Sequence, residues 1–500
     1  MLQLTKPEKI YAELFVAVQS SGVLGDSKTF VDAIPKSDPQ AILDRYRRES
    51  AAESFDLLRF VHDNFELPET ATAGVLPDAG QPVREHIEKL WDSLARDSDT
   101  DDARSSLIGL PRPYIVPGGR FREIYYWDSY FTLLGLAAAG RRQQVEDMVT
   151  NFAYLIDTVG FIPNGNRSYF CSRSQPPYFA MMVELLAELE RDDAAYQRFL
   201  PQLGREYAFW MAGAREHGDG PRARAVPVAG GWLNRYWDEH AAPRPESYAE
   251  DRALADAAGI DEAGLFRNLR AACESGWDFS SRWLADAADL ASIRTTEVVP
   301  VDLNALLYKL ESVLAHAHEV SGDSRAAADF RRRADARREL LQRLFFCERR
   351  GLFTDLLLPD LRRSDTATLA AAYPLFLGIA SEAQAARVAA FVERQLLRPG
   401  GWVISGVASG QQWDAPNGWA PLEWVCYRGL LNYGFVAAAR EGATRWVRNN
   451  LAVYADTGRL MEKYDVETVG RLAGGGEYGV QDGFGWTNGV LLRLLDDLEP

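Results

Sequence analysis

The feature that most constrains this chain is a long succession of amphipathic helical segments. From about residue 130 onward, apolar residues recur at three- and four-residue spacing, as in Met182–Leu189 and Leu303–Ala317. In a third segment, Val388–Leu396 follows Ser381 and Gln384, which form the pattern of a capping box. Comparable runs of alternating strands are missing from the sequence. These patterns predict an all-α chain.

Polar and aromatic residues gather between the helical segments. Loops on a rigid scaffold are where sites are usually built, and six such loops favour a toroid of helix pairs whose connections converge at one end. Short β-strands are possible within loops, near residues 226–231 and 401–407. Residues 1–110 are less aromatic, so we expect a helical extension there, packed on a barrel formed by residues 111–500. The polar and aromatic loops are Pro117–Asp128, Phe161–Gln175, Trp232–Glu246, Glu274–Trp283, Gly410–Pro421 and Glu462–Asn488.

Charge and hydropathy exclude several classes of partner. The formal charge is −16, from 71 acidic and 55 basic residues, and such a surface repels nucleic acid. The densest basic stretch, Arg325–Arg338, alternates with Ala and Asp and indicates the solvated face of a helix. Residues Met1–Lys9 hold no apolar stretch of signal-peptide length, and no later run is long enough to span a bilayer. We therefore expect a cytoplasmic monomer with neither a nucleic-acid nor a membrane partner.

Metal and cofactor motifs are missing from the sequence. His316 and His318 are two residues apart on a predicted helix and so point to different faces, which disfavours a metal site. The stretch Gly483–Gly489 imitates a dinucleotide-binding loop, but its third glycine comes one place late and no strand–helix unit precedes it. We expect no metal and no cofactor.

Five carboxyl groups stand in loops rich in glycine and tryptophan: Asp128, Asp278, Asp414, Glu462 and Glu477. Glycoside hydrolysis needs two carboxyls across the scissile bond, one acting as acid and one as base or nucleophile. Each acid taken alone is more often a helix cap or the partner of a buried arginine. The residues themselves therefore leave the assignment among these five open.

The aromatic setting of Asp278 adds a physical argument. Trp277 and Phe279 flank it, and a carboxyl packed against such rings loses water, which disfavours its charged form and raises its pKa. A general acid needs that shift to hold its proton near neutral pH.

As a set, these loops resemble the trehalase family, glycoside hydrolase family 37, over nearly the whole chain. Two signatures carry the resemblance, Pro117–Tyr130 and Gln412–Pro421. It implies an (α/α)6 toroidal barrel that hydrolyses α,α-trehalose to two glucose molecules with inversion at the anomeric carbon. Further matching segments are Asp26–Asp32, Ser275–Trp283, Glu462–Val466 and Gly474–Gly489.

The resemblance also implies a role for each matched residue. Asp278 matches the general acid and Glu462 the general base, whereas Glu477, the competing candidate for the base, matches a substrate contact. In an inverting enzyme the two catalytic carboxyls should lie roughly 6.5–9.5 Å apart. The substrate-binding residues implied by the resemblance are Arg120, Phe121, Trp127, Asp128, Asn164, Arg173, Ser174, Gln175, Arg244, Pro245, Glu246, Gly276 and Glu477.

Three alternatives stay open at this point. Arg120 and Arg244 could be loop-stitching ion pairs rather than sugar ligands. A sugar-binding protein that has lost catalysis could use the same barrel, although the retention of Asp278 and Glu462 argues against it. Another α-glucosidase or a phosphorylase on a related toroid is disfavoured by the two intact signatures.

Overall fold

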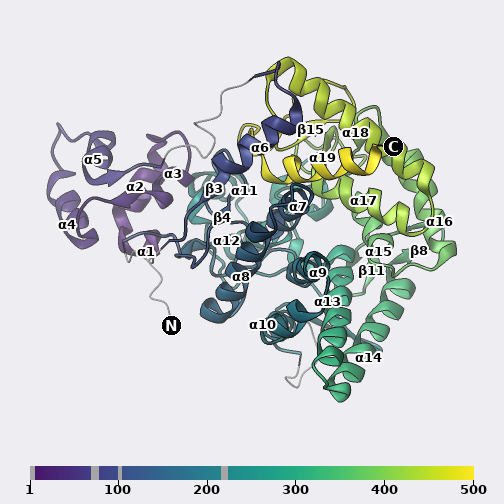
Figure 1. Ribbon diagram of the computed structural model, residues 1–500. Helices are drawn as coiled ribbons and strands as arrows, with labels where there is room; N and C mark the ends of the chain where they lie inside the picture. Colours follow the sequence, from purple (N-terminus) through teal and green to yellow (C-terminus); the bar gives the residue numbers. More distant parts are fainter. Residues whose placement is uncertain (1–5, 69–77, 100–103, 215–222, 500) are drawn as a thin grey trace.

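Six helices form a closed ring at the centre of the computed structural model, which describes residues 6–68, 78–99, 104–214 and 223–499 (Figure 1). Each packs on the next, and the last packs on the first. Their buried apolar residues belong to the main hydrophobic core. In chain order they are α7 (Tyr126–Ala138), α9 (Phe179–Glu190), α13 (Val301–Val320), α15 (Tyr373–Phe376), α17 (Ala420–Asn432) and α19 (Gly485–Leu498).

A second set of helices alternates with the ring helices along the chain and surrounds them. Within the described residues the two sets together make the (α/α)6 barrel, so the predicted fold class is confirmed. Two further helices, α11 (Tyr248–Ala258) and α12 (Glu262–Ser275), are inserted between α10 and α13. The surrounding helices are α6 (Val83–Leu94), α8 (Arg142–Val159), α10 (Ala194–Trp210), α14 (Ser324–Leu340), α16 (Glu382–Phe391) and α18 (Val436–Thr457).

Close backbone contact joins the first and last ring helices. Gly135 on α7 faces Gly489 on α19, and a side chain added to either glycine would run into the backbone of the other helix. The absence of a Cβ therefore lets the two helices approach and complete the ring.

The N-terminal segment has a small core of its own. Its helices pack around Phe15, Phe30 and Phe65, and this core meets the barrel at Tyr125 and Tyr169. Helix α6, by contrast, buries Trp91 and its neighbours in the main core and packs on α19. The packing thus groups α6 with the barrel, and a boundary at residue 110 stays a prediction. The helices of the small core are α1 (Pro7–Ile10), α2 (Ala12–Ser21), α3 (Lys28–Asp32), α4 (Pro39–Glu49) and α5 (Leu57–Asn64).

The strands are short and lie in loops, as predicted. Strands β14 (Asn417–Gly418) and β15 (Tyr464–Asp465) pair antiparallel, which brings the loop before α17 beside the loop after α18. The short strands expected near residues 226–231 form a hairpin of β5 (Ala225–Val228) and β6 (Gly231–Asn234). The other strands are β1 (Ile34–Pro35), β2 (Phe65–Glu66), β3 (Ala95–Arg96), β4 (Tyr114–Ile115), β7 (Val298–Val299), β8 (Phe346–Cys347), β9 (Leu352–Phe353), β10 (Leu356–Leu357), β11 (Arg362–Arg363), β12 (Leu397–Arg398) and β13 (Gly401–Trp402).

The basic stretch on α14 differs from its prediction at one residue. Arg332 and Arg333 lie on the solvent side and pair with Asp329, as a solvated helix face should. Arg337, however, is buried and pairs with Glu311 on α13 at 2.9 Å. Charge pattern alone does not reveal such a residue, because the buried partner comes from another helix.

Within the part of the chain that the structure describes, no helix combines the length and the apolar character needed to cross a membrane.

Candidate active site

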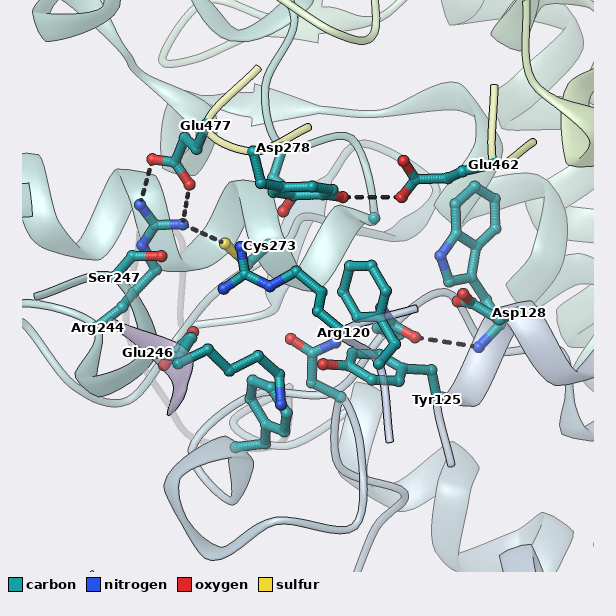
Figure 2. A pocket seen from close by; sticks show the side chains of 18 of the residues that line it. Arg120, Tyr125, Asp128, Arg244, Glu246, Ser247, Cys273, Asp278, Glu462 and Glu477 are labelled. Atoms are coloured by element: carbon teal, nitrogen blue, oxygen red, sulfur yellow. Dashed lines mark hydrogen bonds and ion pairs between the residues drawn. The ribbon is translucent and has the colours of Figure 1, made fainter. Parts of the chain in front are cut away.

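One pocket opens where the loops preceding the ring helices converge (Figure 2). Trp127 and Asp128 come from the first turn of α7, and Trp486 comes from the first turn of α19. Asp278 follows α12, and Glu462 follows α18. Four separate parts of the chain therefore bring their functional groups together only when the ring is closed.

Asp278 is held by contacts on either side along the chain. Gly276 ends α12 with a φ of 75°, and a side chain there would strike the indole of Trp127. The backbone carbonyl of Asp278 accepts a hydrogen bond from the side-chain amide of Gln412. Burial raises the pKa of the Asp278 carboxyl to about 7, although Arg244 acts in the opposite direction. This direction agrees with the desolvation expected from the sequence.

Asp414 has a structural position behind this loop. It is fully buried and accepts hydrogen bonds from the backbone amide of Ser281 at 2.6 Å and from the hydroxyls of Ser280 and Ser281 at 3.0 and 2.9 Å. Its carboxylate is thereby engaged in fixing the segment that follows Asp278.

Glu462 is buried with only 1% of its surface exposed, and hydrogen-bond donors surround it. Tyr478 donates its hydroxyl to Oε1 at 2.9 Å, and the Lys463 ammonium lies 3.3 Å from Oε2. The indole of Trp486 donates to the backbone carbonyl at 2.9 Å. Asp128 lies in the same pocket. Burial raises the pKa of its carboxyl well above the usual range, and the charges of Glu462 and Asp278 add to this effect.

Arg244 is a buried cation with two carboxylate partners. Its guanidinium lies 2.6 Å from Asp251 and 2.8 Å from Glu477, with the ring of Phe279 below it at 5.1 Å. The ion pair with Glu477 connects the loop before α11 to the glycine-rich loop before α19 (Figure 2). Asp251 was not among the residues expected from the sequence, because no motif relates it to Arg244.

The other two predicted arginines differ in their partners. Arg173 lies 2.6 Å from Glu246 and donates to the amide oxygen of Asn164 at 2.9 Å. Arg120 lies over the ring of Tyr478 at 5.0 Å, and the carboxylate of Asp26 is 3.8 Å away. Each arginine thus has a side aimed at the pocket and a partner in the wall.

Stacked indoles form the apolar part of the pocket. Trp413 lies between Trp277 and Trp419, with ring centroids 5.5 and 4.0 Å away and nearly parallel planes. Trp127 and Trp486 pack around this stack and also line the pocket. Because sugar rings present apolar faces, such indoles suit a carbohydrate ligand.

The pocket gathers most of the residues expected from the sequence. Ser174 and Pro245 are outside its lining: the Ser174 hydroxyl donates to the carbonyl of Ile162 at 2.6 Å, and the Pro245 carbonyl accepts from Gln19 at 2.6 Å. The substrate contacts of these two residues stay predictions. Lining residues that the sequence did not single out are Lys28, Tyr125, Phe170, Ser247, Glu250, Cys273, Trp413, Trp419, Tyr478, Phe484 and Trp486.

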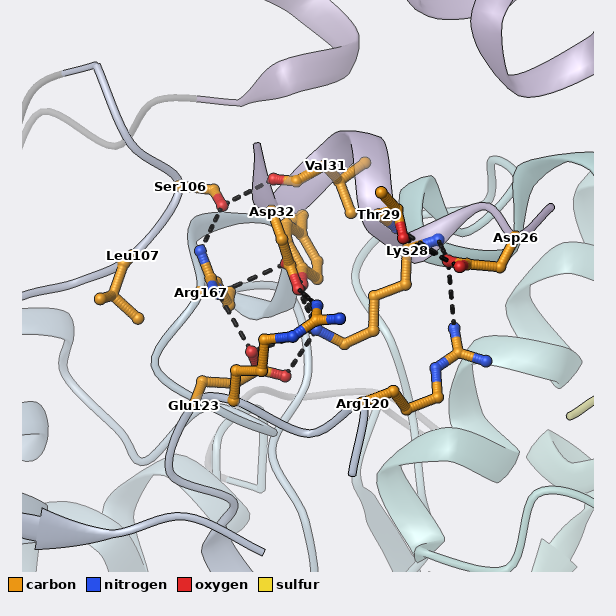
Figure 3. Close-up of polar contacts among 12 residues, drawn as sticks. Asp26, Lys28, Thr29, Val31, Asp32, Ser106, Leu107, Arg120, Glu123 and Arg167 are labelled. Carbon is orange, nitrogen blue, oxygen red and sulfur yellow. Dashed lines mark hydrogen bonds and ion pairs between the residues drawn. The ribbon is translucent and has the colours of Figure 1, made fainter. Parts of the chain in front are cut away.

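A buried charge cluster supports one wall of the pocket and ties the N-terminal segment to the barrel (Figure 3). The ammonium of Lys28 on α3 lies 2.5 Å from Asp32 and 2.8 Å from Glu123 in the barrel loop. Arg167 contacts the same two carboxylates at 3.4 and 3.1 Å. Burial disfavours the charged form of Asp32, but Arg167 and Lys28 outweigh this effect and lower its pKa to about 2.

The change Lys28→Met should destabilise the protein. It leaves the buried carboxylates of Asp32 and Glu123 with Arg167 and the partly exposed Arg122, and breaking a buried pair on one side costs about 3–5 kcal/mol of the free energy of unfolding. Urea unfolding followed by circular dichroism measures the difference. The matched control is Arg59→Met, whose pair with Asp63 is solvent-exposed and should contribute nothing measurable. Equal stability of the two variants would contradict the prediction.

A helical barrel whose pocket holds two buried carboxyls among indoles and arginines is typical of a glycoside hydrolase, and this protein is one. Comparison with known proteins gives the particular kind. The chain belongs to the trehalase family, whose model matches residues 23–499. The periplasmic trehalase of Salmonella paratyphi B is 49% identical over 99% of this chain and 87% of its own length. That of Escherichia coli O139:H28 is 48% identical over 99% and 88%.

Solved structures agree on the fold. The neutral trehalase of Saccharomyces cerevisiae superposes with a TM-score of 0.65 at 25% identity, covering 83% of this chain and 80% of that one. A mannosylglycerate hydrolase of Thermus thermophilus shares the fold at 18% identity, with a TM-score of 0.54 over 82% and 99% of the two chains.

The cytoplasmic location expected from the sequence is wrong. The relatives from Salmonella and Escherichia, similar over nearly the full chain, are named periplasmic trehalases, and they point to the periplasm. The expectation rested only on a missing apolar pattern near residue 1, whereas neither the fold nor the pocket reflects the compartment.

Proposed function

We propose that this protein hydrolyses α,α-trehalose with inversion, using Asp278 as general acid and Glu462 as general base. The observation that carries the proposal is the contrast between two buried carboxyls in one pocket. Burial raises the pKa of Asp278 to about 7, whereas the Glu462 carboxylate accepts hydrogen bonds from the Lys463 ammonium and the Tyr478 hydroxyl. One group is thus poised to give a proton and the other to take one.

The reaction proceeds in one displacement. Asp278 gives its proton to the glycosidic oxygen as the bond from that oxygen to the anomeric carbon breaks. A water molecule attacks the same carbon from the opposite face and loses a proton to Glu462. The leaving glucose keeps the α configuration and the attacked one becomes β. Transfer of the proton from Glu462 through solvent to Asp278 restores the starting state.

The remaining pocket residues bind the two sugar rings. We assign the hydroxyl contacts to Arg120, Arg173 and Arg244, because a planar guanidinium bridges neighbouring oxygens and its wall partners hold it in place. The indole stack around Trp413 offers the apolar face. Phe121, Trp127, Asp128, Asn164, Gln175, Glu246 and Gly276 complete the lining. Since one chain closes the ring and supplies the whole pocket, we propose that it acts as a monomer.

Glu477 is the alternative base, and its surroundings argue against it. Its side chain is 25% exposed and its carboxylate is engaged by both terminal nitrogens of Arg244. We therefore assign to Glu477 a role in the pocket wall, where it pairs with Arg244.

Proton NMR of fresh reaction mixtures tests the inversion. With α,α-trehalose as substrate, equal amounts of α- and β-glucose should form in the first minutes, before mutarotation mixes them. A glucose solution containing only the α anomer, brought to the same conditions, controls for the rate of mutarotation. Early formation of α-glucose alone would mean retention and would remove the role of Glu462 as the base that activates water. If added phosphate gave glucose 1-phosphate, the protein would be a phosphorylase.

A further inference from the structure

Lys463 is a buried ammonium next to the proposed base, and the mechanism above gives it no separate role. Its side chain has no solvent exposure, and the burial of an uncompensated charge is costly. Among the described residues, the carboxylate that pairs with it is Glu462, 3.3 Å from Nζ. The two charges therefore compensate each other inside the pocket wall.

Four groups enclose this ammonium. Nζ donates to the amide oxygen of Gln412 at 2.7 Å and lies 5.0 and 5.2 Å from the ring centres of Trp419 and Tyr478. Aromatic faces attract a cation and bind its uncharged form less well. We call Glu462, Gln412, Trp419 and Tyr478 the ammonium cage. The cage residues come from the loop before α17 and the loop between α18 and α19, which the pairing of β14 with β15 brings together.

Gln412 extends the cage to the proposed acid. Its amide nitrogen donates to the backbone carbonyl of Asp278, while its amide oxygen accepts from Lys463. A single side chain therefore spans the loop of the acid and the cation beside the base. This bridge links the loop after α12 to the loop after α18, and neither loop is part of a helix.

The other groups that face Glu462 are two carboxyls and a hydroxyl. Asp128 and Asp278 are carboxyls in the same pocket, and Tyr478 is a neutral donor whose ring lies beneath the guanidinium of Arg120. Of these neighbours, Lys463 is the one that brings a positive charge into contact with a Glu462 oxygen.

We propose that Lys463 is a positioning residue that keeps Glu462 ionised in acidic solution, and that Gln412 fixes this pair relative to Asp278. The inference rests on the proposed function, because it assigns a partner to the base named there. Lys463 does not touch the sugar; it acts through Glu462.

The test is the pH dependence of kcat/KM for α,α-trehalose in Lys463→Met. Removing the cation makes the Glu462 anion less favourable, so the acidic limb of the profile should move to higher pH by one unit or more. At a pH on that limb, the variant should then lose at least about tenfold more activity than at the optimum. Lys309→Met is the matched control: it removes a lysine that pairs with Glu184 away from the pocket, and its profile should coincide with that of the unchanged protein.

A second variant keeps the lysine in place. Gln412→Glu offers the ammonium another carboxylate and adds a negative charge near Glu462, so it should move the acidic limb in the same direction even if Lys463→Met does not fold. A loss that is uniform across pH in both variants would overturn the proposal and leave Lys463 a purely structural role. Glu462→Gln separates the two ideas: an active Glu462→Gln enzyme refutes the proposed function. If Glu462→Gln is inactive but the acidic limb of the kcat/KM profile does not move in Lys463→Met, only this inference about Lys463 is refuted.

Discussion

Asp278→Asn should lower kcat for α,α-trehalose by about 10²–10⁴-fold while leaving KM nearly unchanged. The amide has the shape of the carboxyl but no proton to give to the glycosidic oxygen, and general acid catalysis is worth about that factor. The proton transfer occurs only in the transition state, so substrate binding should survive. The measurement is glucose release under steady-state conditions. Asp63→Asn, which changes an exposed carboxyl on α5, is the matched control and should be fully active.

The pH profile and the leaving group sharpen this prediction. In the unchanged protein Asp278 has a pKa of about 7 and must be protonated, so kcat/KM should fall about tenfold per unit above pH 7. In Asp278→Asn that limb should disappear. A substrate whose leaving group needs no proton, α-glucosyl fluoride, should restore most of the rate. If the fluoride were hydrolysed as slowly as trehalose, Asp278 would not be the acid.

Glu462→Gln should lose a similar factor, about 10²–10⁴-fold in kcat, for a different reason. The amide cannot take a proton from water, so the nucleophile stays weak with every leaving group. The variant should therefore be equally inactive on trehalose and on α-glucosyl fluoride. Glu467→Gln is the matched control, because that residue is half-exposed and pairs with Arg398 on the surface.

The two substrates together give each carboxyl a distinct signature. Recovery of Glu462→Gln on the fluoride would exchange the two assignments. Near-normal activity of Glu462→Gln on trehalose would transfer the role of base to Glu477, the alternative in the same pocket. Inactivity of both variants with intact sugar binding is the outcome that the two-carboxyl mechanism requires.

The helical architecture could be predicted because apolar spacing reports which face of a helix is buried. The segment expected at 303–317 is part of α13, and the capping box of Ser381 and Gln384 begins α16 as predicted. What spacing does not show is the partner of a buried face. Helix α6 is amphipathic like many others, and only its packing on α19 reveals that it belongs to the barrel.

The site was predictable to the extent that its residues form local motifs. Asp278 and Glu462 each stand in such a motif, and the structure brings both to one pocket; their roles stay predictions. Asp251 could not be predicted as a partner of Arg244, because the pair depends on how α11 folds back on the preceding loop. Lys463 was part of a recognised motif, but its enclosure by Trp419 and Tyr478 arises from tertiary structure.

The contact between Gly135 and Gly489 has a consequence for how the enzyme folds. It joins the first ring helix to the last, so the barrel is a ring closed by two helices that lie far apart in the sequence. Contacts so distant in sequence form late, because the intervening chain must be ordered before they repay its loss of entropy. Asp128 and Asp278 should therefore lie on an open arc of helices until α19 packs on α7, and the pocket should be complete only after this contact forms.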